Sequence, residues 1–198
     1  MIRSRISVNT WLKRTPTVDE ARPAACVDCG AAARPAGGAL MLHGHGLRDR
    51  QLRGPPTAQA PPAAAVIACR RYRCQRCAAV HVVLPSEAVP RRHYAATAIA
   101  FALALYGTLG RPQHVVRAAV SAVSVVGVAA LRRWRTLPRW IDALAARALF
   151  PSLPPMPRGE ARRTIAARAA MAIGAHAPPS LPEGAPQVRA FVGVVHMP

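Results

Sequence analysis

Apolar residues in the second half of the chain recur at the spacing of helices. Between residues 94 and 106, Ile99, Leu103 and Tyr106 follow one another at intervals of four and three, which places them on one face of an amphipathic helix. Gly107 is a natural end for this helix. The same pattern, together with the proline positions, predicts helices over residues 94–106, 112–120, 128–135, 138–149 and 160–173.

Shorter apolar runs before residue 91 predict strands. These runs occupy residues 39–46, 47–54, 66–73 and 79–84. A reversal near Gly44 or Gly46 would join the first two strands. Residues 54–65 are rich in proline and alanine, which is typical of a mobile excursion between strands. The last apolar run, 187–196, predicts an edge strand or a frayed end.

Two C-x-x-C pairs lie on either side of most of the predicted strands. Cys26 with Cys29, and Cys74 with Cys77, supply four thiolates at the spacing that a structural zinc ion takes. Gly30 directly after the first pair is the residue type that tolerates the positive φ of a tight metal-binding turn. The spacing therefore predicts one structural Zn²⁺ per chain in a zinc ribbon.

Other sulfur and imidazole side chains lie close to these pairs in sequence. Cys69 has the opposite strand parity to Cys74, so we expect a small buried residue there rather than a ligand. His43, His45 and His81 have the chemistry to replace a thiolate, but four well-spaced cysteines are already present. We expect these histidines to be polar strand residues or phosphate contacts.

The charge of the chain narrows the class of partner. There are 27 Lys and Arg against 8 Asp and Glu, which gives a formal net charge of +19. Such an excess favours a polyanion, nucleic acid first and an anionic membrane surface second. The uncharged run 93–110 is too short and too rich in alanine for a spanning helix, and no secretory signal opens the chain. We therefore expect a cytoplasmic protein with reduced thiols and no membrane role.

Arginines surround the second cysteine pair. If the segment is a strand, Arg71 and Arg73 share one face while Arg70 and Tyr72 share the other. Positive charge here screens the excess negative charge of four thiolates, and it equally suits contacts to phosphate. We take Arg70, Arg71 and Arg73 as candidate DNA contacts.

A second group of arginines belongs to the predicted helix 128–135. Helix, helix, turn and helix, with Arg132, Arg133 and Arg135 on the last member, is the pattern of a helix-turn-helix DNA reader. Trp134 is expected to anchor this helix in the core. A positively charged, merely solvated face is the open alternative for the three arginines.

The stretches CVDCG, HGHGLRDRQLRG, CRRYRCQRCAAVHVVLP and GVAALRRWR carry a family resemblance. Residues 26–145 resemble the zinc-ribbon plus helix-turn-helix region at the front of many bacterial insertion-sequence transposases, and similar small stand-alone proteins of unknown function. The resemblance implies zinc on the four paired cysteines, DNA binding, and a recognition helix carrying Arg132, Arg133 and Trp134. It also suggests a transposase, or a second copy of the chain, as a protein partner.

The sequence lacks the patterns of an enzyme. Its eight acidic residues are scattered, and no G-x-S-x-G, phosphate-cradling glycine loop or H-E-x-x-H is present. We therefore expect no catalysis and no small-molecule substrate. The predicted function is binding of double-stranded DNA, as a transposon-associated accessory factor, a regulator or a transposase remnant. RNA binding, or protein docking by a zinc-ribbon adaptor, is the alternative, and a membrane-associated role is less favoured.

The predicted architecture is α+β in four parts. Residues 1–20 form a flexible basic arm, and 21–90 form the zinc ribbon with its insert at 54–65. Residues 91–150 form the helix-turn-helix domain, and 151–198 hold a proline-rich linker, one basic helix and a frayed C-terminus.

Overall fold

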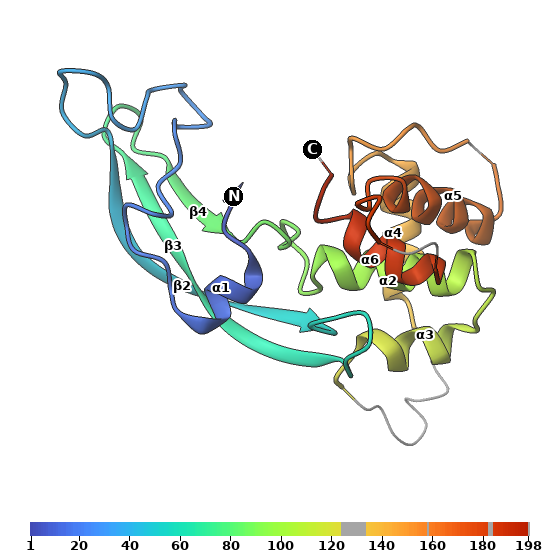
Figure 1. Ribbon diagram of the computed structural model, residues 1–198. Helices are drawn as coiled ribbons and strands as arrows, with labels where there is room; N and C mark the ends of the chain where they lie inside the picture. Colours follow the sequence, from blue (N-terminus) through green and yellow to red (C-terminus); the bar gives the residue numbers. More distant parts are fainter. Residues whose placement is uncertain (124–133, 158, 182–183, 198) are drawn as a thin grey trace. The chain divides into compact units, whose positions relative to one another are not determined.

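The computed structural model describes residues 1–123, 134–157, 159–181 and 184–197 (Figure 1). The chain divides into two compact units. The first unit contains residues 1–52 and 65–93, and the second contains residues 53–64 and 94–198. A four-stranded mixed sheet and six helices make up the described elements, so the α+β class is confirmed.

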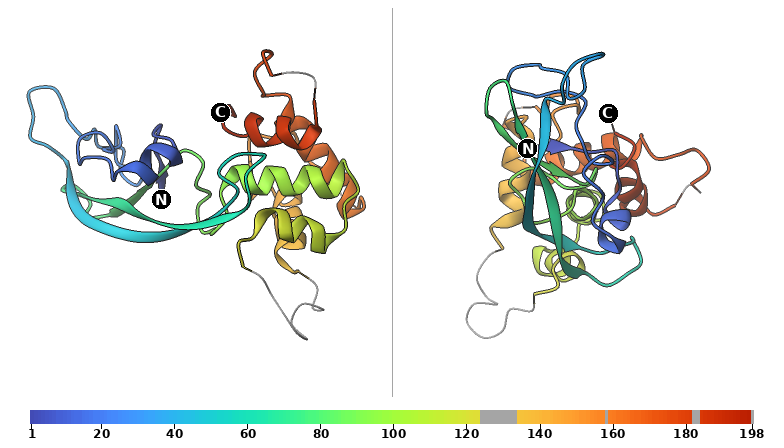
Figure 2. Two further views of the ribbon diagram at one scale, coloured as in Figure 1. Left: turned by 60° about the horizontal axis from the view of Figure 1, so that its bottom comes forward. Right: turned by 90° about the vertical axis from the view of Figure 1, so that its left-hand side faces the viewer.

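The first unit is built on the sheet. Strands β1 (Ile2–Arg3), β2 (Leu42–Gly54), β3 (Ala63–Cys74) and β4 (Val80–Leu84) are arranged in the order β1-β4-β3-β2. Strand β4 runs parallel to β1 and antiparallel to β3. Strands β2 and β3 are the longest of the four, with 13 and 12 residues, and Figure 2 shows them curving together. The predicted strands at 66–73 and 79–84 therefore correspond to β3 and β4.

Strand β2 differs from the prediction of two strands joined by a reversal. It runs without interruption through Gly44 and Gly46. Gly46 has a φ of +80°, which glycine adopts without steric cost and which creates a local irregularity rather than a turn. Next to Gly44 lies Val18, whose Cγ1 would be 3.0 Å from an added Cβ. Gly44 thus makes room for Val18, whereas Gly46 supplies the positive φ within the same strand.

The N-terminal segment also differs from the predicted flexible arm. Strand β1 pairs with β4, and helix α1 (Val8–Lys13) begins at Ser7, whose hydroxyl accepts from the Thr10 N–H. Trp11 on α1 is buried, and its indole N–H donates to the Ala68 carbonyl at 2.9 Å. One large aromatic residue therefore anchors a segment whose scattered charges predict no structure.

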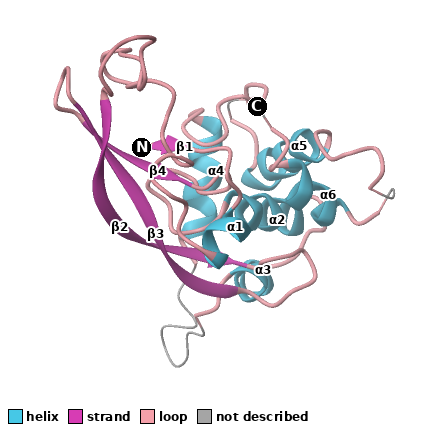
Figure 3. Cartoon of the chain, turned by 60° about the vertical axis from the view of Figure 1, so that its left-hand side comes forward, coloured by secondary structure: helices cyan, strands magenta, loops and turns pink. Residues whose placement is uncertain are grey.

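The second unit is helical (Figure 3). It contains α2 (Ala96–Gly107), α3 (Gln113–Val120), α4 (Thr136–Ala145), α5 (Arg162–Gly174) and α6 (Pro186–Gly193). These agree with the predicted helices at 94–106, 112–120, 138–149 and 160–173. Where the sequence predicts an edge strand or a frayed end, α6 forms instead, with Pro186 in its first turn and Phe191 packed edge-on against Phe101.

Helix α2 is buried on every side rather than on one face. All of its residues from Ala96 to Leu105 are buried, and α3, α4, α5 and α6 all contact it. Alanine side chains allow this, because their small volume lets neighbouring helices approach from all directions. Close approach is most evident at Gly107, where an added Cβ would lie 2.2 Å from the backbone nitrogen of Ala167 on α5.

Within the described ranges, no helix combines the length and the apolar content that crossing a bilayer requires.

Candidate metal centre

Four cysteines from two distant parts of the first unit lie together. Their sulfur atoms are all within 4.8 Å of one another, and the group can hold a metal ion. The Sγ atoms of Cys26 and Cys77 are 3.6 Å apart, and those of Cys29 and Cys74 are 3.7 Å apart. The two C-x-x-C pairs therefore converge on one cluster, as their spacing predicts.

The two pairs sit in turns with the same backbone pattern. In the first, the Cys26 N–H donates to Ala31 O and the Gly30 N–H donates to Cys26 O, both at 2.9 Å. In the second, the Cys74 N–H donates to Ala79 O at 2.9 Å, and the Ala78 N–H donates to Cys74 O at 3.0 Å. The chain has thus built the same sulfur-presenting turn twice.

Each turn needs a residue with positive φ directly after its second cysteine. Gly30 supplies it with a φ of +70°, which confirms the expectation for this glycine. Ala78 holds the equivalent place with a φ of +58°. An L-residue in this region costs about 1–2 kcal/mol. The second turn is therefore held in a less favourable conformation than the first.

The cluster has an apolar support on one side. Cys26 and Cys74 are buried together with Ala33 and Leu42, and Leu42 is the first residue of β2. A backbone hydrogen bond joins the second cysteine turn to the residue before β2, since the Gln75 N–H donates to Met41 O at 2.8 Å. The start of β2 thus lies against both cysteine turns and holds them at a fixed separation.

Hydrogen bonds and crowding give the sulfurs unequal acidities. The pKa of Cys74 is lowered to about 7, first because the Cys77 N–H donates to its sulfur and also because the Arg76 N–H does, against the opposing effect of burial. At Cys77 a hydrogen bond from the Ala79 N–H also lowers the pKa of the thiol. Desolvation and hydrogen bonding with the three neighbouring sulfurs outweigh this effect and raise the pKa to about 12. Several thiolates this close repel one another, and a bound cation would remove that repulsion.

His81 is a neighbour of the cluster that sequence spacing does not single out. It is buried, its Nε2 lies 3.1 Å from the Cys26 Sγ, and it is 3.8 Å from the Asp28 carboxylate. Cys26, Asp28 and His81 form a second, overlapping group with metal-binding chemistry. The signal that identifies His81 is its cross-strand pairing with Tyr72, which depends on the register of β3 and β4.

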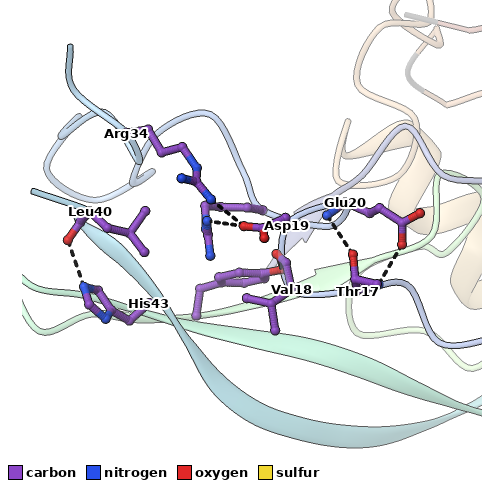
Figure 4. A network of polar contacts seen from close by, with 9 residues as sticks. Thr17, Val18, Asp19, Glu20, Arg34, Leu40 and His43 are labelled. Carbon is purple, nitrogen blue, oxygen red and sulfur yellow. Dashed lines mark hydrogen bonds and ion pairs between the residues drawn. The ribbon is translucent and has the colours of Figure 1, made fainter. Parts of the chain in front are cut away.

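The remaining histidines and Cys69 lie outside the cluster. His43 contacts the Leu40 carbonyl at 2.8 Å, in the region of Figure 4 where Arg34 pairs with Asp19 and Thr17 bonds with Glu20. His45 is exposed. Cys69 is fully buried, and burial raises the pKa of its thiol to about 11. The expectation of a small buried residue at Cys69 is confirmed.

The arginines of β3 alternate as the strand pattern predicts. Arg71 pairs with Val82 and Arg73 with Val80, so all four share one face of the sheet. On the other face the Arg70 Nε–H donates to Pro16 O at 2.7 Å. The Tyr72 hydroxyl lies on that face too and donates to Val18 O at 2.6 Å. One donor of Arg70 is therefore bound within the protein, and segment 16–18 covers that face.

A cationic cleft adjoins the face of Arg71 and Arg73. It has a volume of about 210 Å³, and Val82 is among its lining residues. The cleft contains one acid, Asp49. Its cationic lining consists of Arg48, Arg50, Arg91 and Arg92, with His93 beside them. Arg50 is committed to structure, since its guanidinium donates to the carbonyls of Val89 and Arg92.

Most of the predicted recognition helix, 128–135, lies outside the described residues, and with it Arg132 and Arg133. Arg135 is exposed and is the N-cap of α4. Trp134 is buried, with its ring centroid 6.4 Å from that of Tyr94 and 5.5 Å from that of Trp140. Trp134 therefore anchors the core of the second unit, as expected.

Fold and site together define a small α+β protein with a four-cysteine candidate metal centre beside an arginine-bearing sheet face. Residues 35–134 of the 198 match the family described as a domain of unknown function, DUF6431, and the chain belongs to that family. The matched segment contains Cys74 and Cys77 but begins after Cys26 and Cys29. Comparison with curated proteins and with solved structures finds no match. The resemblance to transposase N-terminal regions stays a prediction.

Proposed function

We propose that this chain is a zinc-dependent DNA-binding protein. One structural Zn²⁺ on the four clustered cysteines would join the two sulfur-presenting turns into a zinc ribbon, and arginines would bind the phosphates of a duplex. The observation that carries the proposal is the sheet face of Arg71 and Arg73, which continues into the arginine-lined cleft of the same unit.

The sulfur separations support zinc. Tetrahedral coordination with Zn–S bonds of about 2.3 Å separates neighbouring sulfurs by roughly 3.8 Å. The Cys26–Cys77 and Cys29–Cys74 sulfur pairs lie at 3.6 and 3.7 Å. A structural zinc ion supplies no catalytic chemistry. It neutralises the thiolates and converts its binding free energy into folding free energy.

Charge supports a polyanionic partner for the arginines. Even if every one of the 8 acidic residues paired with a different basic one, most of the 27 Lys and Arg would remain without an acid. Several acids are already paired on their own unit, as Asp19 is with Arg22 and Arg34. The exposed arginines therefore need solvent ions or phosphates, and phosphate contacts release condensed counterions from DNA.

The aromatic residues favour a duplex over single-stranded RNA. The chain has three each of Trp, Tyr and Phe. All are buried except Tyr106, which is partly buried beneath the Arg163 guanidinium. Single-strand binding relies on exposed rings on which bases stack. Tyr72, which alternates with the β3 arginines, is fully buried and cannot serve in this way.

The more specific part of the proposal is a transposon-associated accessory factor or regulator, or a transposase remnant. It rests on the resemblance described above, with Arg132, Arg133 and Arg135 as the reading residues of a helix-turn-helix. No catalytic role is assigned to the chain.

The metal part is tested by elemental analysis of the purified full-length protein. Wild type and Cys69→Ser are expected to contain about one zinc per chain, because Cys69 is no ligand, whereas Cys74→Ser is expected to lose it and to unfold the first unit. A fully folded wild-type protein without metal would refute the zinc assignment.

The DNA part is tested on the zinc-loaded protein by competition between duplex DNA and single-stranded RNA at several salt concentrations. Arg71→Ala and Arg73→Ala should each weaken binding to all duplexes and lower the salt slope by about one unit. Lys13→Ala is the control, since α1 leads into segment 16–18, which covers the opposite face of the sheet.

Two results would contradict the proposal. Better retention by RNA than by duplex DNA would replace DNA with RNA as the partner. Equal losses in Lys13→Ala and the β3 variants would mean that net charge, rather than this face of the sheet, accounts for binding.

A further inference from the structure

The helical unit contains a cavity of about 410 Å³ with a strongly cationic lining. Three of its lining residues are arginines and one is a glutamine, and Pro138 completes the set: Gln113, Arg135, Pro138, Arg139 and Arg162. The volume is within the range of small-molecule sites, about 300–1,000 Å³. Such a lining selects for an anion with several acceptor oxygens.

The positive charge in this cavity is only partly neutralised. Asp142 forms two hydrogen bonds with Arg162, at 3.0 and 3.1 Å, and so offsets one guanidinium. Arg135 and Arg139 are exposed, and neither has an acidic partner among the residues that the structure describes. Two guanidinium groups on adjacent turns of the start of α4 are therefore available to a ligand.

The backbone adds to the same charge. Gln113 is the first residue of α3, Arg135 is the N-cap of α4, and Arg162 is the first residue of α5. None of these three helices has a side-chain hydrogen bond at its N-cap or an acidic residue in its first turn. Helix starts carry partial positive charge and N–H groups without intrahelical partners, which favour an anion.

We propose that this cavity binds a phosphate group through Arg135 and Arg139, with Gln113 as a neutral donor and Arg162 held in place by Asp142. Two sources share this chemistry, free inorganic phosphate and a phosphodiester of a DNA backbone. The DNA source rests on the function proposed above. The inorganic source does not, so the site can be tested independently of that function.

The first arm of the test measures inorganic phosphate binding to the full-length, zinc-loaded protein by titration calorimetry at low ionic strength. Arg135→Gln and Arg139→Gln each remove one charge-assisted contact and should weaken binding about tenfold. Arg147→Gln is the matched control, because it follows the C-terminal end of the same ten-residue helix, about 15 Å from the cavity. Unchanged thermal unfolding of each variant shows that it is folded.

The second arm measures binding of the same variants to a short duplex DNA. Loss of DNA affinity in Arg135→Gln and Arg139→Gln, but not in Arg147→Gln, identifies the backbone as the phosphate source. Loss of inorganic phosphate binding with unchanged DNA affinity identifies free phosphate instead.

The proposal is overturned if folded Arg135→Gln and Arg139→Gln bind both probes as wild type does. It is equally overturned if Arg147→Gln loses as much as they do. A wild-type protein that binds inorganic phosphate but no DNA would refute the proposed function and leave this site standing.

Discussion

Gly107, at the end of α2, is a position in the helical unit where an added side chain would meet the backbone of a neighbouring helix. An added Cβ would lie 2.2 Å from the Ala167 backbone nitrogen and 2.6 Å from the Ala166 carbonyl carbon. Ordinary van der Waals contacts begin at 3.4 Å, so α5 would have to move by more than about 1 Å. Backbone atoms cannot rotate away as a side chain can. We therefore predict that Gly107→Ala separates α2 from α5.

The expected cost follows from two opposing effects. Overpacking of a well-packed contact costs about 3 kcal/mol at the upper end of its usual range. The higher helix propensity of alanine returns at most about 1 kcal/mol. The net loss of about 2 kcal/mol corresponds to a fall in melting temperature of about 4–8 °C for a chain of this size.

Thermal unfolding followed by far-ultraviolet circular dichroism measures this effect, and Gly174→Ala is the matched control. Gly174 ends α5, and its added Cβ would meet nothing closer than 3.5 Å, an ordinary contact. This variant should melt at or slightly above the wild-type temperature. Equal melting temperatures for Gly107→Ala and wild type would refute the reasoning that α2 and α5 touch through backbone at this glycine.

Three further predictions concern the sheet unit. Burial raises the pKa of Cys69 from 9.0 to about 11. The folded state therefore keeps its full stability below pH 9 and loses part of it as the pH rises towards 11. Cys69→Ala should show a flatter dependence of unfolding free energy on pH over that range, measured by urea titrations. Trp11→Phe removes the indole donor to the Ala68 carbonyl and should cost about 1–3 kcal/mol, measured by urea unfolding. The hydrogen bond from Arg14 is the main cause that lowers the pKa of Glu20 from 4.5 to about 2. This pairing therefore stabilises the fold above pH 4.5, and the stabilisation is lost as the pH falls towards 2. Glu20→Gln should remove this loss of stability at acid pH.

Each of these has a contradicting result. The Cys69 reasoning is wrong if wild type and variant lose stability in parallel above pH 9. An unchanged urea midpoint in Trp11→Phe would mean that the hydrogen bond adds nothing to stability. Identical acid profiles for wild type and Glu20→Gln would mean that the exposed pairing with Arg14 is screened in solution.

Local spacing was sufficient to predict the cysteine cluster and the faces of β3. A C-x-x-C pair brings its own turn, and strand alternation separates Arg71 from Tyr72 without knowledge of the partner strand. His81 required more, because its place beside Cys26 depends on the register between β3 and β4. Spacing along one segment carries no information about the register between two.

In the helical unit, periodicity predicts where α2 lies but not how completely it is buried. The periodicity of Ile99 and Leu103 predicts a helix at the right place, but it also predicts a solvent-facing side. The structure has no such side over residues 96–105, since the intervening alanines are covered as well. Alanine is a weak signal in either direction, because its methyl group fits a core and exposes little apolar area on a surface.

The family segment and the two compact units of the structure have different boundaries. Residues 35–134 retain Cys74, Cys77 and α2, but exclude the upstream cysteine pair and the helices α5 and α6 that cover α2. A fragment cut at these limits would leave Cys74 and Cys77 without their partner pair and would expose the largely apolar helix α2 to water. In this chain, residues 26–29 and helices α5 and α6 therefore complete what the family segment begins: the first pair closes the cysteine cluster, and the two helices cover α2.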